Sequence, residues 1–237
     1  MYRRIINLAL SLVILCNICS AEEIKDGNHI VVANRGAGKY VALTFDDGPH
    51  PEYTDQILDI LEQNGAKATF FIIGKNAEQY PDIVKKEFDA GHEIGNHTYS
   101  HPNMTGITIE EAIKEIEKTQ DIIFEITGER PKLFRSPGGY YYDELVGAIE
   151  GIDCRAVLWS WRQDTRDWKK PSVESIVKTV MSNLQDGDII LFHDYNTKGS
   201  PTPEALKILI PALQEKGYSF VTVSELMKIH EKESDGV

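Results

Sequence analysis

The feature that most constrains this chain is a repeated alternation of short apolar runs with amphipathic segments. Apolar runs such as Val41–Phe45 and Asp188–Phe192 lead into polar loops, and each is followed by a stretch with apolar residues at helical spacing. About seven of these strand–helix units can be traced along the chain. Because strands that are joined by crossover helices run parallel, the chain is predicted to be an α/β protein with a parallel sheet.

About seven or eight units of this kind can close into a barrel, and an open doubly wound sheet is the alternative. The sequence contains no GxGxxG segment and no P-loop, so the usual nucleotide-binding signals of an open sheet are absent. The boundaries of the longest helix are also indicated. Thr108 and Glu111 have the spacing of a capping box, and Gly128 ends the helical pattern.

The first residues have the layout of a secretory signal. Arg3 and Arg4 form a short positive region, an apolar stretch is strongest from Leu8 to Cys16, and Ser20-Ala21 gives a small-residue end. The stretch is shorter than the about 20 apolar residues that span a membrane, and an uncleaved anchor is the alternative. We predict a signal peptide over residues 1–21, an N-terminal leader over 22–38 and the folded domain over 39–237, with no membrane span after cleavage.

The charge balance excludes some classes of function. The 237 residues include 37 acidic and 25 basic side chains, for a formal net charge of −12. Because phosphate contacts need clustered Lys and Arg, this balance argues against a nucleic-acid binder and against docking on an anionic membrane surface. Outside the predicted signal only Cys154 remains, so we expect no internal disulfide and a buried, inert thiol.

Chemically reactive side chains collect where the predicted strands end. In both βα architectures, ligands bind at the carboxyl ends of the strands. Five strand ends carry such segments, which are Thr44-Phe45-Asp46-Asp47-Gly48, His97-Thr98-Tyr99-Ser100-His101, Arg135-Ser136-Pro137-Gly138-Gly139, Asp164-Thr165-Arg166-Asp167-Trp168 and Leu191-Phe192-His193-Asp194. Because five strands end in reactive side chains, we predict a single functional site at the carboxyl ends of the strands.

A metal site is one interpretation of the first two segments. Adjacent carboxylates such as Asp46 and Asp47 repel unless a cation or a proton separates their roles, although Asp-Gly-Pro is also good turn chemistry. His97 and His101 are four residues apart, which places both imidazoles on one side of a helical turn. Two His and a carboxylate give three protein ligands and leave a position for water, as in catalytic zinc sites. The spacing alone does not place Asp47 beside the two imidazoles.

The remaining segments indicate proton transfer. Asp167 and His193 together are typical of an imidazole whose tautomer and pKa are set by a carboxylate. Around Gly138, the glycine-containing loop lets backbone N–H groups approach a ligand. Each residue taken singly has a plainer interpretation, since Arg135 is typical of a structural arginine, and Trp168 and Leu191 are typical of a core.

With these segments in order, the chain resembles the polysaccharide deacetylases, the fourth family of carbohydrate esterases. The resemblance covers about Lys39 to Lys228, and the five segments occur in the order of the family's five motifs. It implies a distorted (β/α) barrel with about seven parallel strands, and it makes residues 39–237 the catalytic domain.

The resemblance implies a metal centre with a base beside it. Asp47, His97 and His101 then hold one divalent metal ion. Asp46 is the general base, and Arg135 pairs with Asp46 and fixes its orientation. Two His and a carboxylate suit Zn²⁺, which is favoured, with Co²⁺, Fe²⁺ and Ni²⁺ as the alternatives.

The resemblance also implies the acid and the substrate contacts. His193 is the general acid, and Asp167 buttresses it. Trp168 and Leu191 flank the pocket for the acetyl methyl group, and the backbone N–H of Gly138 binds the oxyanion.

The third motif departs from the family pattern. The family usually has a large residue, often Tyr, where this chain has Gly138. The backbone N–H is retained, so the chemistry is expected to survive. The shape of the groove is what this departure changes, and Tyr140 or Tyr141 is a candidate to supply the missing side chain.

We therefore expect a secreted or cell-envelope hydrolase that removes acetyl groups from N-acetylated sugars of a polysaccharide or oligosaccharide, such as peptidoglycan or chitin, and releases acetate. The alternatives are an O-acetyl xylan esterase of the same family and a non-catalytic glycan-binding protein. Competent residues at all the matched positions argue against the last. The expected partner is the acetylated glycan, with no nucleic acid, and the chain is expected to be a monomer.

Overall fold

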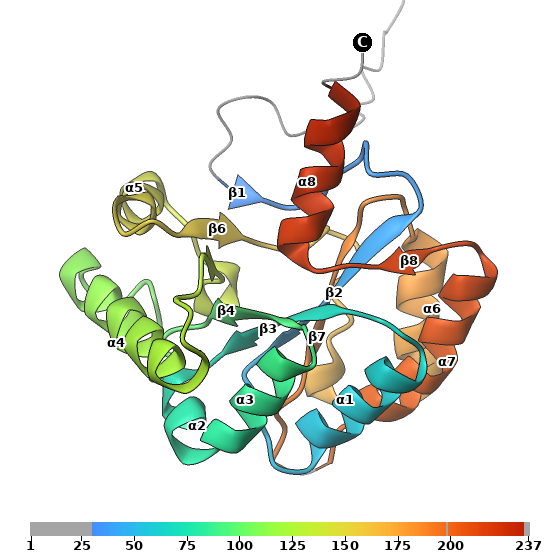
Figure 1. Cartoon of the computed structure of the whole chain (residues 1–237), viewed down its shortest axis with the longest axis horizontal. Helices are drawn as coiled ribbons and strands as arrows, with labels where there is room; N and C mark the ends of the chain where they lie inside the picture. The colour runs from blue at the N-terminus through green and yellow to red at the C-terminus, as the bar shows by residue number, and fades with distance from the viewer. Residues whose placement is uncertain (1–29, 198, 235–237) are drawn as a thin grey trace, which may run out of the picture.

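The computed structural model describes residues 30–197 and 199–234, and Figure 1 shows how their helices surround a central sheet. The predicted signal peptide and the first part of the predicted leader lie outside the described residues. Within the described part of the chain, no helix combines the length and the apolar character that crossing a bilayer requires.

Seven strands form one continuous parallel sheet, as the sequence predicted. Their order across the sheet is β1-β6-β5-β4-β3-β2-β7, and the short β8 pairs in parallel with the start of β2. The strands are β1 (Ile30–Val31), β2 (Tyr40–Asp46), β3 (Ala68–Ile72), β4 (Glu93–Asn96), β5 (Leu133–Phe134), β6 (Arg155–Val157), β7 (Ile189–His193) and β8 (Ser219–Phe220).

Helices connect these strands on the outside of the sheet. The α-helices are α1 (Tyr53–Gln63), α2 (Gly74–Gln79), α3 (Pro81–Asp89), α4 (Ile109–Thr127), α5 (Asp143–Gly151), α6 (Val173–Asn183), α7 (Thr202–Glu215) and α8 (Val223–Ser234), and the 3-10 turns are η1 (Pro137–Gly139) and η2 (Asp167–Lys169). The predicted capping box of α4 is confirmed, because Glu111 N–H donates to Thr108 Oγ1 while the Glu111 carboxylate accepts the Thr108 N–H. Gly128 ends α4 in the left-handed conformation, with φ 82°.

Irregular chain, and not a further ladder, closes the barrel between its edge strands β1 and β7. After β6 the chain runs beside β7 and makes a single parallel bridge between Asp164 and Leu191. On the other side, Ala33 makes an antiparallel bridge to Asp188. The distorted (β/α) barrel is therefore confirmed, and the distortion lies at this seam.

The segment that the sequence assigned to the leader contributes one strand of the sheet. Ile30 and Val31 of β1 pair with Ala156 and Val157 of β6, and Val31 is buried. A two-residue strand has too few positions to show an apolar alternation, so the sequence pattern did not indicate it.

The two faces of the sheet differ in character. On β2, Leu43 and Phe45 pack outward in the core under the helices, whereas Ala42 belongs to the smaller core inside the barrel. Because side chains alternate along a strand, Thr44 and Asp46 share the inward face with Ala42. The interior of the barrel thus becomes polar toward the carboxyl ends of the strands, which we call the carboxyl end of the barrel.

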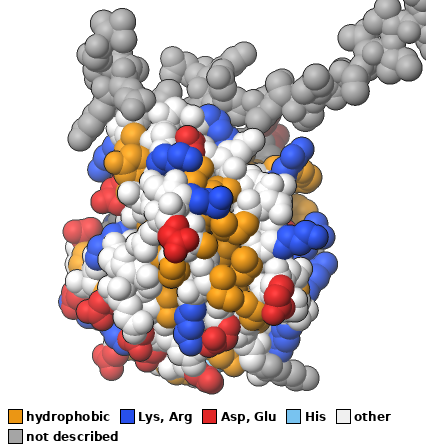
Figure 2. Space-filling model, turned by 90° about the vertical axis from the view of Figure 1, so that its right-hand side faces the viewer, with side chains coloured by type: hydrophobic (Ala, Val, Ile, Leu, Met, Phe, Trp, Pro, Cys, Tyr) orange, Lys and Arg blue, Asp and Glu red, His pale blue; other side chains and the backbone are white. Residues whose placement is uncertain are grey.

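Helices α6 and α7 pack on one another and cover the sheet beside β7. On this side of the molecule, Figure 2 shows hydrophobic side chains gathered in a strip between charged ones. Val177 and Met181 of α6 are partly buried against the core, and Ile208 of α7 exposes half of its surface.

Cys154 is a buried, unpaired cysteine, as expected. Gln120 donates a hydrogen bond to its Sγ atom. Burial raises the pKa of the thiol to about 11, so the reactive thiolate is disfavoured at neutral pH.

Candidate active site

The end of β2 presents two carboxylates in different directions. Asp46 ends the strand and faces the interior of the barrel, while Asp47 turns the chain with a left-handed φ of 75°. Asn76 holds this turn by donating a side-chain hydrogen bond of 2.7 Å to the carbonyl oxygen of Asp47. Left-handed backbone at a non-glycine residue is strained, and such strain is common at functional sites.

The structure brings Asp47 together with both imidazoles. Asp47 Oδ1 lies 3.4 Å from His97 Nε2 and 3.4 Å from His101 Nε2. These three ligand atoms lie within 4.8 Å of one another. Asp47 Oδ1 is buried and has no hydrogen-bond partner among the described residues. A buried carboxylate oxygen that faces two imidazole nitrogens has the chemistry of a divalent metal site, and the predicted ligand set fits it.

The imidazole of His97 is oriented for ligation. Its Nδ1 atom lies 2.7 Å from the backbone oxygen of Arg135, so Nδ1 carries a proton and Nε2 is the ring nitrogen left to bind a metal. Burial raises the pKa of Asp47, but the neighbouring imidazoles of His97, His193 and His101 outweigh burial and lower this pKa to about 2. Burial, with the neighbouring His97, lowers the pKa of His101.

The loop that carries both imidazoles is fixed from several sides. The N–H groups of Gly74 and Lys75, at the start of α2, donate to the backbone oxygens of Thr98 and Tyr99. Thr98 Oγ1 also accepts the N–H of His101 at 3.1 Å. Thr98 and His101 both have left-handed φ, 69° and 55°. The hydrogen bonds therefore hold a backbone conformation that a β-branched residue rarely adopts.

Arg135 and Asp46 form a fully buried ion pair inside the barrel. Arg135 Nη1 donates to Asp46 Oδ1 at 2.7 Å and to Thr44 Oγ1 at 2.8 Å. The guanidinium carbon lies 4.1 Å from the centre of the Phe71 ring, and Gly95 makes room for that ring, because a Cβ on Gly95 would come within 2.5 Å of it. This packing fixes Asp46, whose second oxygen lies 3.9 Å from His97 Nε2.

His193 and Asp167 are also joined, as the sequence predicted. His193 Nδ1 lies 2.8 Å from Asp167 Oδ1, and the His193 N–H donates to Asp167 Oδ2 at 2.8 Å. Thr202 donates a further hydrogen bond to Asp167 Oδ2 at 2.5 Å. Burial opposes charge on the imidazole, but the hydrogen bond and charge of Asp167 outweigh burial and raise the pKa of His193 to about 9. His193 is therefore protonated at neutral pH.

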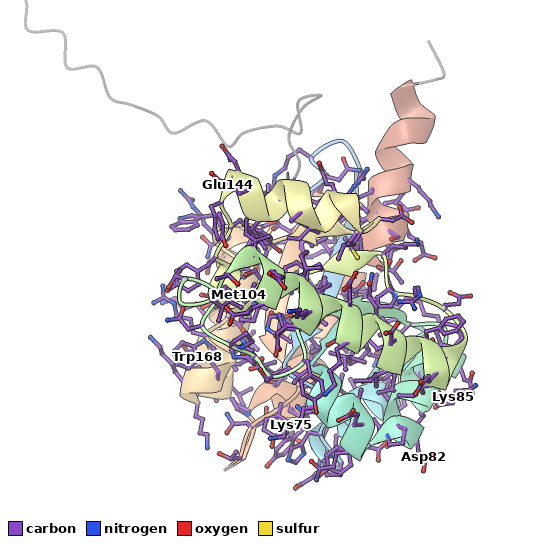
Figure 3. The ribbon with its side chains drawn as sticks, turned by 90° about the vertical axis from the view of Figure 1, so that its left-hand side faces the viewer. Lys75, Asp82, Lys85, Met104, Glu144 and Trp168 are labelled. Atoms are coloured by element: carbon purple, nitrogen blue, oxygen red, sulfur yellow. The ribbon has the colours of Figure 1, made fainter. Side chains whose placement is uncertain are left out.

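Two of the three predicted substrate contacts, Leu191 and Trp168, lie next to the His193–Asp167 pair along the chain. Leu191 is buried two residues before His193 on β7, so both side chains are on the same face of the sheet. Trp168 follows Asp167 and is half exposed, and Figure 3 shows Trp168 and Met104 at one end of the barrel and Lys85 toward the other. Among the contacts of the described residues, none joins Trp168 or Gly138 directly to the metal-binding side chains.

The two tyrosines after the third motif separate into different roles. The Tyr140 ring lies over Gly138, because a Cβ on Gly138 would come within 2.8 Å of Tyr140 Cε2. Tyr140 exposes 54% of its surface. The Tyr141 hydroxyl instead donates to the backbone oxygen of Phe134 and accepts the N–H of Ser136. Of the two candidates, Tyr140 occupies the space beside Gly138, and Tyr141 anchors the loop.

Sequence reasoning missed several residues that support the site. Thr44 accepts a hydrogen bond from Arg135, and Thr202 donates one to Asp167, so each supports one of the two pairs Arg135–Asp46 and Asp167–His193. Alternation along β2 could have indicated Thr44, which shares its face with Asp46. Thr202 lies 35 residues from Asp167 in the sequence, and no local pattern connects them.

The site thus combines three features. It has a ready-made set of metal ligands, a buried carboxylate held by an arginine, and an imidazole kept protonated by a second carboxylate. A buried carboxylate, a paired imidazole and a candidate cation site at one barrel mouth are the kinds of group that metal-assisted hydrolysis uses.

Comparison with known proteins identifies relatives of this site. The sequence model described as "Polysaccharide deacetylase" matches residues 33–157 of this chain. A peptidoglycan-N-acetylglucosamine deacetylase of Bacillus cereus is 46% identical over 193 residues, which cover 80% of this chain and 89% of that protein. Some other curated relatives are longer, and the matched region is 39% of their length.

Similar solved structures also include deacetylases and esterases that act on glycans. The Bc1960 peptidoglycan N-acetylglucosamine deacetylase superposes with a TM-score of 0.78 at 39% identity, over 85% of this chain and 94% of that chain. A family 4 acetyl xylan esterase from Clostridium thermocellum, solved with a cobalt ion, has a TM-score of 0.75 at 36% identity, over 81% of this chain and 91% of that chain.

Proposed function

The chain belongs to the polysaccharide deacetylase family, a family of metal-dependent hydrolases, and from this premise we propose that it is a metal-dependent N-deacetylase of a cell-wall glycan. The reaction replaces the acetamide of an N-acetylated sugar with a free amine and releases acetate. Peptidoglycan, through its N-acetylglucosamine units, is the proposed substrate, because the relatives reported above include two peptidoglycan N-acetylglucosamine deacetylases.

The observation that carries this proposal is the position of Asp47 Oδ1. It faces the Nε2 atoms of His97 and His101 at 3.4 Å each and has no hydrogen-bond partner among the described residues. We assign the divalent ion to these three side chains, with Zn²⁺ favoured. When bound, such an ion would lower the pKa of a water molecule and polarise the acetyl carbonyl.

Asp46 is the proposed general base. Its carboxylate lies beside the metal-binding side chains and is held by Arg135 through a 2.7 Å hydrogen bond. The fixed orientation leaves the second oxygen, Oδ2, on the side of His97, 3.9 Å from Nε2. From there Asp46 can take the proton of the attacking water, and positioned proton transfer contributes about 10²–10⁴-fold to the rate.

His193 is the proposed general acid. Amide hydrolysis requires a proton on the departing nitrogen, and the charged imidazole supplies it from Nε2 while Nδ1 stays bonded to Asp167. The pKa of about 9 keeps this proton available at neutral pH. The N–H of Gly138 is the proposed donor to the oxyanion of the tetrahedral intermediate.

Aromatic side chains are proposed to bind the sugar rings. Trp168 and Tyr140 each expose about half of their surface, and they follow the Asp167 and Gly138 segments. Aromatic rings present a large flat apolar face that stacks on sugars. Leu191 and Trp168 are proposed to flank the acetyl methyl group.

A cell-wall substrate fits the proposed export. We propose that residues 1–21 are a cleaved secretory signal, that 22–38 are a leader whose residues 30–31 add β1 to the sheet, and that 39–237 are the catalytic domain. The mature protein is then secreted or associated with the cell envelope, and it is proposed to act as a monomer.

An O-acetyl esterase is the second candidate function, and the acetyl xylan esterase among the similar structures favours it. An ester has a better leaving group than an amide, so it depends less on a general acid. Loss of His193 should therefore separate the two reactions.

Acetate release across a glycan panel tests the proposal. The purified protein is stripped of metal, reloaded with Zn²⁺ or Co²⁺, and incubated with peptidoglycan, chitin oligomers and acetylated xylan. We expect metal-dependent release from the N-acetylated glycans, which His193→Ala reduces by about 10²-fold or more. Release from xylan alone, little affected by His193→Ala, would favour the esterase. No release from any glycan by the reloaded protein would contradict both activities.

A further inference from the structure

Asp194, next to the proposed acid His193, is a buried carboxylate for which the proposed chemistry has no use. It exposes 1% of its surface. Asp194 directly follows β7, and its side chain reaches Thr54 at the start of α1. Its Oδ2 accepts a 2.6 Å hydrogen bond from Thr54 Oγ1, and its Oδ1 has no hydrogen-bond partner among the described residues.

Thr54 connects Asp194 to the loop that follows Asp47. The Thr54 hydroxyl accepts the backbone N–H of His50 at 2.8 Å while it donates to Asp194. In addition, the N–H of Asp194 donates to the backbone oxygen of Asp46 at 3.2 Å. The chain from Asp46 to His50 is thus tied at both ends to Asp194, the residue that directly follows β7.

Direct packing adds a third constraint on this loop. The Asp194 carboxylate lies against Gly48 so closely that a Cβ on Gly48 would come within 2.1 Å of Oδ2. Asp194 is a short side chain whose carboxylate is held by Thr54, so it cannot swing away as the end of a long side chain would.

Resting on the metal site of the proposed function, we propose that Asp194 is a positioning residue of that site. Acting through Thr54 and Gly48, it holds the strained backbone at Asp47 and thereby sets the direction of Asp47 Oδ1 toward the two imidazoles. The left-handed φ of 75° at Asp47 needs such support, because the turn would otherwise relax. Outer partners of this kind typically control metal affinity by about 10–100-fold.

The chain contains a matched control for this link. Thr69, at the opposite end of the barrel, also has a fully buried hydroxyl. It accepts the N–H of Val223 at 3.0 Å and donates to the carboxylate of Glu93 at 3.0 Å. Thr54→Val and Thr69→Val therefore each delete two hydrogen bonds of the same kind. Thr54→Val does so beside the metal site, and Thr69→Val does so far from it.

Co²⁺ titration of the metal-free protein, followed by its visible absorption spectrum, tests the proposal. We expect Thr54→Val to weaken Co²⁺ binding by about 10–100-fold and to change the spectrum, while Thr69→Val matches the wild type. Thr54→Ser keeps the hydroxyl and should restore affinity. Asp194→Ala should show the same loss as Thr54→Val, and the double variant should lose little more, because both changes break one link.

Thermal unfolding of the metal-free variants separates positioning from general stability. Both valine variants should lower the melting temperature, because each leaves a buried carboxylate short of one partner. If Thr54→Val and Asp194→Ala bind Co²⁺ as tightly as Thr69→Val, with unchanged spectra, the positioning role is wrong and the proposed function stands. If the wild type itself binds no Co²⁺, the proposed metal site fails instead.

Discussion

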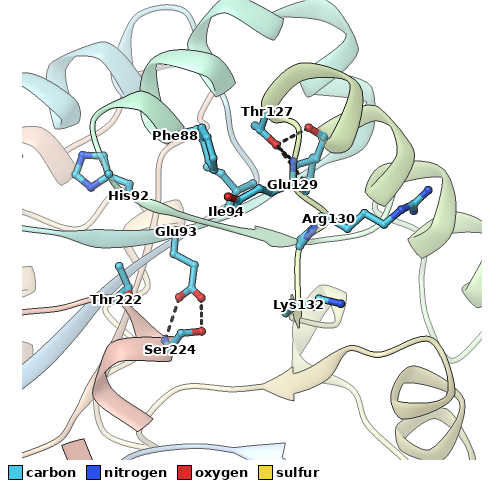
Figure 4. Close-up of a pocket in the computed structure, with 13 residues that line it drawn as sticks. Phe88, His92, Glu93, Ile94, Thr127, Glu129, Arg130, Lys132, Thr222 and Ser224 are labelled. Atoms are coloured by element: carbon cyan, nitrogen blue, oxygen red, sulfur yellow. Dashed lines mark hydrogen bonds between the residues drawn. The ribbon is translucent and has the colours of Figure 1, made fainter. Parts of the chain in front are cut away.

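The two ends of the barrel differ in whether their charged side chains have partners within the protein. At the amino ends of the strands, a cavity of about 410 Å³ is lined in part by Glu93, Arg130 and Lys132 (Figure 4). These charged side chains have partners, since Thr69 and Ser224 donate to Glu93, and Arg130 and Lys132 form ion pairs with acidic residues. The cavity is roomy, and these charges are satisfied within the protein.

Two carboxylates of the carboxyl end differ from these charges. Asp47 Oδ1 and Asp194 Oδ1 are buried there without hydrogen-bond partners among the described residues. Of the six non-glycine residues with positive φ in the described chain, five lie in the loops of this end, namely Asp47, Thr98, His101, Arg166 and Lys170. Unsatisfied ligand atoms and strained backbone mark this end as the functional one.

Deleting a metal ligand should give the largest difference between the two ends. We expect His97→Ala to abolish deacetylation and to weaken metal binding by more than the roughly 10–100-fold that outer partners control. Glu93→Gln, at the amino end, should leave both unchanged, because Glu93 binds only Thr69 and the start of α8. Co²⁺ titration and acetate release measure the two effects. Similar losses in both variants would remove the distinction between the ends.

Asp46→Asn should separate chemistry from metal binding within the carboxyl end. The amide keeps the shape of the side chain but cannot accept the proton of water. We expect kcat to fall by about 10²–10⁴-fold while the metal content stays at the wild-type level. Turnover by the reloaded variant and elemental analysis check this outcome. A matching loss of metal would instead make Asp46 a ligand.

Asp167→Asn should move the alkaline limit of activity. His193 acts as an acid only while protonated, so activity is expected to persist below its raised pKa of about 9 and to fall above it. Without the charge of Asp167, the pKa should drop toward its ordinary value of 6.5. The alkaline limb of the kcat/KM profile should then shift to lower pH. An unshifted limb would mean that a group other than His193 causes the fall in activity at alkaline pH.

The Asp167–His193 pair should also make the stability of the metal-free protein depend on pH. Because folding raises the pKa of His193, the stabilisation is complete below its ordinary value of 6.5 and is lost as pH rises through about 9. Denaturant unfolding between these pH values should show the decline in the wild type and a smaller one in Asp167→Asn. Equal declines in the two proteins would contradict the assigned pair.

Tyr140→Ala should have the smallest effect, on the substrate and not on the chemistry. Tyr140 is exposed beside Gly138 and bonds none of the proposed catalytic side chains among the described contacts. Loss of one stacking ring is expected to raise KM for a glycan by up to about tenfold and to leave kcat nearly unchanged. Steady-state kinetics on a chitin oligomer measures both constants. A fall in kcat with constant KM would place Tyr140 in the reaction itself.

The sequence predicted what repeats or lies close together along the chain. The strand–helix alternation gave the parallel sheet, and the spacing of Thr108, Glu111 and Gly128 gave the ends of α4. His97 and His101 could be paired by spacing. Joining them to Asp47, some 50 residues earlier, rested on a resemblance, and the structure brings the three together.

Contacts that depend on tertiary structure could not be predicted in this way. Thr54 meets Asp194 across 140 residues, and Thr202 meets Asp167 across 35 residues. Each is an ordinary threonine near the start of a helix, so no local pattern sets it apart. The two-residue β1 was missed for the same reason, because its place is fixed by pairing with β6 and not by its own sequence.

The most direct test of the account is to locate the bound ion. The metal-free protein is reloaded with one equivalent of Zn²⁺, crystallised, and examined by anomalous scattering at the zinc edge. The metal-site assignment predicts one ion bound by Asp47 Oδ1 and the Nε2 atoms of His97 and His101, with Asp46 beside it and still held by Arg135. An ion bound elsewhere, for example beside His92 and Glu93 at the amino end, or no bound ion at all, would contradict it.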